Sequence, residues 1–96
     1  MEQRARITHM EQILDEVTDA VSSLTEALEK YSAVQDKLQK LAAYYGSEQW
    51  RRDFDDDNSG KIPHDLKRGV LSEDAVYNLL ANHMELTARM KALTAR

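Results

Sequence analysis

The stretch with the most groups that could bind a cation is residues 55–66, DDDNSGKIPHDL. Its first eight residues fit an EF-hand loop, with Asp55, Asp57 and Ser59 at loop positions 1, 3 and 5 and a glycine at position 6. Oxygen ligands at alternate residues suit a hard cation such as Ca²⁺. Leu66 stands where the loop needs a bidentate glutamate, so we assign no metal ligand and interpret the stretch as an acidic turn. A loop protein that responds to divalent cations remains an alternative.

Catalytic groups are not brought together by any spacing in the chain. None of the three histidines, His9, His64 and His83, has an acidic residue four positions later, and no H-E-x-x-H pair occurs. Carboxylates are frequent, but nothing in the sequence gathers them into the paired acids or the nucleophile and base that catalysis needs. We therefore expect no catalytic residue, no cofactor and no enzymatic activity.

Basic side chains are dense only beside the acidic run of residues 53–57. Arg51, Lys67 and Arg68 lie in the same connecting segment as Trp50. Surface ion pairs with the acidic run are one interpretation, and a contact site for a protein partner is the other. The acidic run could also imitate the spacing of phosphates, which makes an acidic inhibitor of nucleic-acid-binding proteins a further alternative.

The composition restricts the class of protein. The 96 residues carry a net charge of −4 and no cysteine, which removes disulfides and thiolate sites. No basic patch of the kind that binds nucleic acid and no run of 18 apolar residues is present. We expect a cytoplasmic protein that binds neither nucleic acid nor membrane. Only three glycines and one proline leave too few turns for an all-β fold, so one helical domain over 1–96 is expected.

A heptad pattern covers the first half of the chain and predicts one helix over about 3–45. With Ile7 at position a, eleven of the twelve a and d positions up to Tyr45 are apolar or aromatic, and only Gln35 breaks the pattern. Position g is also mostly apolar, whereas the e positions 11, 18, 25, 32 and 39 are all polar. The apolar stripe is therefore wide and leans to one side, as in helix bundles.

The connection over 46–72 has its own local signals. Gly46 suits the end of the long helix, and Ser47 suits the N-cap of a short helix over about 48–56. This helix would place Trp50 and Phe54 on one face, where they form a small aromatic core together with Tyr44 and Tyr45. A helical turn is expected to begin at Pro63 and to close at a glycine, Gly69.

The last helix is predicted over about 73–94, with Ser72 as its N-cap and with Leu71 and Val76 at the two positions of a hydrophobic staple. The fold class is therefore all-α, a long N-terminal helix and an antiparallel C-terminal helix in a hairpin or bundle. The last helix covers about half the length of the first, so the apolar stripe over residues 7–20 needs another partner. We expect a homodimer through the long helix; a monomer with a kink near Gln35 is the alternative.

Three strings in the chain resemble a small uncharacterised bacterial family that is carried as a domain of unknown function. They are RITHMEQILDE, YYGSEQWRRDF and IPHDLKRGVLSED, and the resemblance runs from about residue 4 to residue 80. It implies a protein of about this length, of the kind common in Gram-positive bacteria, and it carries over no catalytic or binding residue. It also implies that the connection is the characteristic part of the family.

Overall fold

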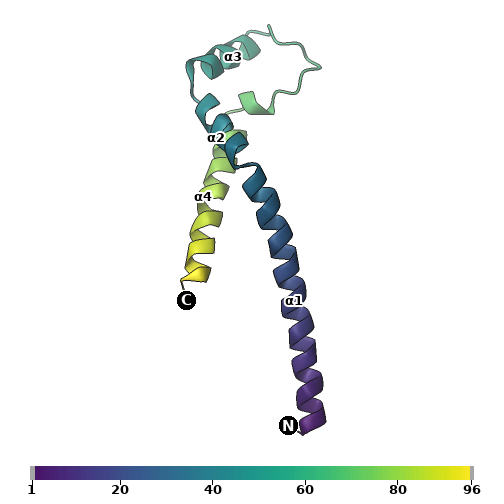
Figure 1. The fold of residues 1–96 in the computed structure, drawn as a ribbon. Helices are drawn as coiled ribbons and strands as arrows, with labels where there is room; N and C mark the ends of the chain where they lie inside the picture. Colours follow the sequence, from purple (N-terminus) through teal and green to yellow (C-terminus); the bar gives the residue numbers. More distant parts are fainter. Residues whose placement is uncertain (1, 96) are drawn as a thin grey trace. The chain divides into compact units, whose positions relative to one another are not determined.

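All regular structure within residues 2–95, the part that the computed structural model describes, is helical (Figure 1). The elements in chain order are α1 (Gln3–Ala33), α2 (Gln35–Tyr44), α3 (Glu48–Asn58), the 3₁₀-helix η1 (Gly69–Leu71) and α4 (Ala75–Thr94). The all-α expectation, with a long N-terminal helix, a connection and a C-terminal helix, is confirmed. The chain divides after Asp36 into two compact units, which we describe separately. Residues 1 and 96 lie outside the described range.

The single helix expected over 3–45 is instead two helices, divided at Val34. This residue leaves the helical conformation, with φ −103° and ψ 4°, and its N–H turns back to the carbonyl of Tyr31 at 3.2 Å. The side-chain amide of Gln35 donates to the same carbonyl at 2.9 Å. Gln35, the polar residue that interrupts the heptad pattern, therefore satisfies a carbonyl at the break.

The short helix α3 begins where the sequence predicts and ends later. The Ser47 hydroxyl accepts a hydrogen bond from the N–H of Trp50 at 3.2 Å, and Gly46 before it has φ +82°. The helix extends to Asn58, two residues beyond its predicted end. It closes at Gly60, where φ is +74° and the N–H groups of residues 60 and 61 bond to the carbonyls of residues 57 and 56. This pair of bonds is a Schellman motif.

Gly69 does not have the closing role that the sequence predicts for it. The chain makes a turn after Pro63, where the N–H of Leu66 bonds to the Pro63 carbonyl at 3.1 Å. Gly69 then starts η1, and positive φ occurs only at Gly46 and Gly60 within the described residues. The expectation that Gly69 closes the helical turn that begins at Pro63 was therefore wrong.

Replacing Gly60 with alanine is expected to lower the free energy of unfolding by about 1 kcal/mol, because a side chain is strained at positive φ. Gly69→Ala is the matched control: its φ is not positive and its added Cβ meets nothing within 4 Å. Urea denaturation followed by tryptophan fluorescence compares the two variants. Equal losses of stability would contradict the assignment of Gly60 as the C-terminal closure of α3.

The core of the second unit forms around η1, which contacts both α3 and α4. Leu71 and Val76 are the two buried apolar residues among those described, with 7% and 3% of their surface exposed. They are the pair that the sequence places at the staple positions. The Ser72 hydroxyl accepts a hydrogen bond from the N–H of Ala75 at 3.1 Å, as an N-cap would, although α4 itself begins at Ala75.

Candidate functional site

The acidic stretch that resembles an EF-hand loop is largely helical. Asp55 and Asp57 lie in the last turn and a half of α3, so they do not present ligands from an extended loop. Asp57 accepts a hydrogen bond at 2.6 Å from the guanidinium of Arg68, and Asp56 lies 3.9 Å from the ammonium of Lys61. Within residues 2–95 no group of three or more metal-ligating side chains comes together. The loop geometry that the spacing suggested is therefore absent from this stretch.

The ion pair between Arg68 and Asp57 holds the segment before η1 against α3. Both side chains are largely covered, since 23% of the Asp57 side chain and 34% of the Arg68 side chain are exposed. Partial burial and a direct charged hydrogen bond make this pair stronger than a fully exposed one. Of the two interpretations of the basic residues, the ion pair with the acidic run therefore holds for Arg68.

An aromatic cluster connects the end of α2 to α3. The rings of Trp50 and Phe54 stack with centroids 5.1 Å apart, and Tyr45 meets Trp50 edge to face at 5.2 Å. The indole N–H of Trp50 donates to the carbonyl of Val70 at 2.9 Å, and the Tyr45 hydroxyl donates to the carbonyl of Glu73 at 3.1 Å. The predicted aromatic core therefore also anchors η1 and the start of α4.

A second contact between α2 and α3 was not foreseen from the sequence. The Tyr44 hydroxyl donates to a carboxylate oxygen of Asp53 at 2.6 Å. This hydrogen bond, together with partial burial and the negative charge of Asp53, raises the pKa of Tyr44 from 10.0 to about 12. Because the folded-state pKa is raised, the stabilisation by this contact is present below about pH 10 and is lost as the pH rises toward 12.

Asp53→Asn is expected to return the pKa of Tyr44 toward its ordinary value of about 10, because an amide oxygen accepts a weaker hydrogen bond from the hydroxyl than a carboxylate does and carries no charge for the phenolate to oppose. Ultraviolet titration of the tyrosines measures this shift. Tyr44→Phe is the control: the tyrosine that titrates near pH 12 must disappear from its titration curve. If a tyrosine still titrates near pH 12 in Asp53→Asn, a group other than Asp53 raises the pKa of Tyr44.

Of the four residues that the sequence suggests as a partner site, two are engaged within the fold. Trp50 bonds to Val70 and Arg68 bonds to Asp57, whereas Arg51 and Lys67 are exposed. Lys67 lines an apolar groove of about 410 Å³ in the second unit. The other residues that line the groove are Leu41, Gly69, Val70, Ala75, Val76 and Leu79.

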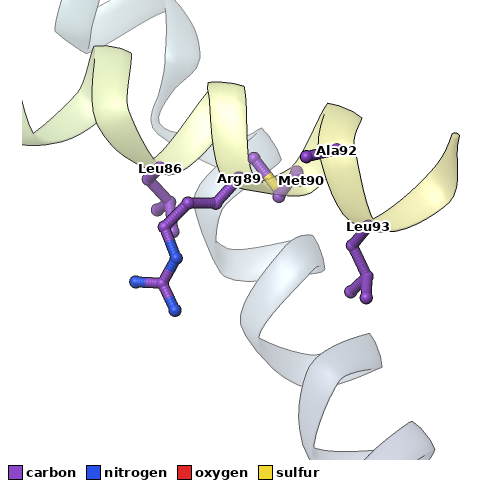
Figure 2. A pocket seen from close by; sticks show the side chains of 5 residues that line it. All are labelled: Leu86, Arg89, Met90, Ala92 and Leu93. Carbon is purple, nitrogen blue, oxygen red and sulfur yellow. The ribbon is translucent and has the colours of Figure 1, made fainter. Parts of the chain in front are cut away.

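Another hollow lies along the last turns of α4 (Figure 2). It measures about 440 Å³ and is lined by Leu86, Arg89, Met90, Ala92 and Leu93. Figure 2 shows Leu86, Arg89 and Leu93 extending from one side of the helix. The lining is apolar apart from Arg89, so the hollow offers contact surface and no paired acid and base.

The longest run of exposed apolar side chains belongs to α1. No residue of α1 is buried, and its large apolar side chains are exposed by between 39% at Ile13 and 59% at Val21. We call this set the α1 stripe; it comprises Ile7, Met10, Ile13, Leu14, Val17, Val21, Leu24 and Leu28. Seven of the eight occupy the a and d positions that the sequence pattern identifies, and Ile13 occupies a g position.

Within the described residues no helix is both long and apolar enough to cross a membrane. Comparison with curated proteins and with solved structures finds no match. A family model for a domain of unknown function (DUF4298) matches residues 7–93, which include α2, α3 and η1 in full and nearly all of α1 and α4. The resemblance to a small uncharacterised family is thereby confirmed, and the chain belongs to this family.

Proposed function

We propose that this protein is a non-enzymatic helical interaction module that associates with a second copy of itself through α1. The observation that carries the proposal is the α1 stripe, which exposes eight large apolar side chains along one face of a helix about 46 Å long. An exposed apolar surface of this extent is typical of an interface. Two pairs of polar side chains in the second unit, Tyr44 with Asp53 and Arg68 with Asp57, bond to each other, which supports a non-enzymatic role.

The α1 stripe is large enough to support a dimer. Burying the exposed half of each side chain contributes about 1 kcal/mol, so sixteen such side chains from two copies contribute about 16 kcal/mol. Association costs about 4–15 kcal/mol in lost freedom of motion. The difference lies between about 1 and 12 kcal/mol, and the value we expect within that span is about 8 kcal/mol, which corresponds to a micromolar dissociation constant.

Val21→Glu is expected to weaken self-association by at least about tenfold, because it places a charge at the centre of the α1 stripe. The matched control is Ser22→Glu, which adds the same charge one residue later on the polar side of α1. Sedimentation equilibrium over a range of concentrations measures both dissociation constants, and circular dichroism confirms that the two variants are equally helical.

Two results would contradict the proposal. The first is a mass equal to one chain for the unmodified protein at about 100 μM, well above the expected dissociation constant. The second is an equal loss of association in Val21→Glu and Ser22→Glu. That result would show that the added charge weakens association equally on the apolar and the polar face of α1, so that the apolar face is not the interface.

A further inference from the structure

The two flanks of the α1 stripe differ in polarity, and this difference bears on how two copies would pair. The g flank is apolar, with Ile13, Ala20 and Ala27, whereas the e flank is polar, with Thr18 and Thr25. Two parallel helices bring the g flank of one against the e flank of the other. Two antiparallel helices bring g against g and e against e. Only the antiparallel arrangement gathers the apolar flanks on one side of the pair and the polar flanks on the other.

The positions along the α1 stripe also match when the helix is paired with a reversed copy. When the a positions of one copy meet the d positions of the reversed copy, the pairing is centred on residue 19 of each helix. Every a and d residue from 7 to 31 then faces an apolar or aromatic residue of the other copy. The pairs are Val17 with Val21, Leu14 with Leu24, Met10 with Leu28 and Ile7 with Tyr31. The full length of the stripe is thus used.

The g flank is complementary in size in the same arrangement. Ala20 meets Ala20 of the second copy near the twofold axis, and Ile13 meets Ala27. Small side chains at the axis allow the two helices to approach closely, and the larger Ile13 lies opposite a small residue. Complementary sizes at facing positions are what close packing requires.

The charges at the ends of α1 favour the reversed copy as well. Arg4 and Arg6 lie in the first two turns, and no acidic residue lies in the first turn of this helix. Cations are unfavourable at the positive N-terminal end of their own helix. A reversed copy brings its negative C-terminal end to the same place, because residues 4 and 6 face residues 34 and 32 in this alignment.

We propose that α1 pairs with α1 of a second copy in the antiparallel orientation, with the twofold axis midway between Val17 and Val21. This inference rests on the proposed function, because it names the geometry of the same association. Ala20 then faces its own counterpart across the axis, while Met10 of each copy lies beside Leu28 of the other.

The absence of native cysteine allows the orientation to be tested by introducing single thiols. Ala20→Cys is expected to form a disulfide-linked dimer, because g positions at the axis face each other. Met10→Cys alone is expected to stay unlinked, but mixed with Leu28→Cys it forms the mixed disulfide. Oxidised glutathione serves as oxidant and is reduced to two thiols for each disulfide formed. Ser22→Cys, on the polar side, is the unlinked control.

The outcome that would overturn the antiparallel pairing is self-linking of Met10→Cys together with no linking of Ala20→Cys, which only parallel helices in register would produce. An absence of linking in every variant would overturn the alignment. Sedimentation of the same variants under reducing conditions separates these results from failure of the proposed function. A dimer that links in the wrong pattern contradicts the orientation alone, whereas a single-chain mass contradicts the association itself and the orientation with it.

Discussion

Trp50→Ala is expected to lower the free energy of unfolding of the second unit by about 3–5 kcal/mol, the cost typical of removing a packed tryptophan. The variant loses the stack on Phe54, the edge contact with Tyr45 and the hydrogen bond to the Val70 carbonyl. A unit of about 60 residues has a total stability of roughly 3–9 kcal/mol. This single substitution therefore removes a large part of the stability, and thermal unfolding followed by circular dichroism measures the loss.

Trp50→Phe is the matched variant, because it keeps an aromatic ring between Tyr45 and Phe54 and removes the indole N–H. Its expected cost is about 0.5–1.5 kcal/mol, from the lost hydrogen bond and the smaller ring, because water reaches the exposed Val70 carbonyl. If Trp50→Phe were as damaging as Trp50→Ala, the hydrogen bond to Val70 would outweigh the stacking. A loss below about 1 kcal/mol for Trp50→Ala would contradict the role of the aromatic cluster as an anchor.

Leu71→Ala is expected to cost about 2–4 kcal/mol, because Leu71 is one of the two buried apolar residues among those described and the cavity left behind cannot be filled by exposed neighbours. Val70→Ala is the control. Val70 is adjacent in sequence and 42% exposed, and its backbone carbonyl, which Trp50 uses, is unchanged by the substitution.

The single tryptophan reports on this region, so urea denaturation followed by its fluorescence compares the two variants directly. The expected cost of Val70→Ala is below about 1 kcal/mol. Equal midpoints for Leu71→Ala and Val70→Ala would show that burial at η1 does not determine the stability of the second unit.

Features of the fold that depend on neighbouring residues were predictable from the sequence. Ser47 and Ser72 accept the backbone hydrogen bonds expected of N-caps, and Gly46 has the positive φ expected after α2. The staple pair of Leu71 and Val76 proved to be the buried pair. In each case the signal and its effect lie within a few residues of each other.

The errors arose where two local signals competed. Aspartate, asparagine, serine and glycine over residues 55–60 are typical of a turn, yet the Schellman motif at Gly60 lets α3 continue to Asn58. In the same way, the heptad pattern runs through Val34 and favours one helix, whereas the Gln35 side chain stabilises the break. The heptad pattern identifies the apolar face of the helix, but it does not indicate which backbone carbonyls can accept a hydrogen bond from a side chain.

The contacts of the candidate site could not be predicted because they join residues that no local pattern connects. Nothing in the sequence indicates that Tyr44 donates to Asp53, that Trp50 donates to the carbonyl of Val70, or that Arg68 selects Asp57 from a run of acids. These partners are determined by how α3 and η1 pack together. The apolar face that forms the α1 stripe, in contrast, was predictable from periodicity alone, although its exposure was predicted only over residues 7–20 and extends to Leu28.

The side-chain hydrogen bonds that hold the second unit together have a consequence for the rate at which it folds. They join residues separated by 9, 11, 20 and 28 positions along the chain. Each loop to be closed is therefore short, and the entropy lost before a contact forms is small. Helical proteins, in which most contacts lie within helices, fold within about microseconds to milliseconds. We therefore expect the connection to close on η1 rapidly, which would leave its aromatic side chains exposed to other chains only briefly.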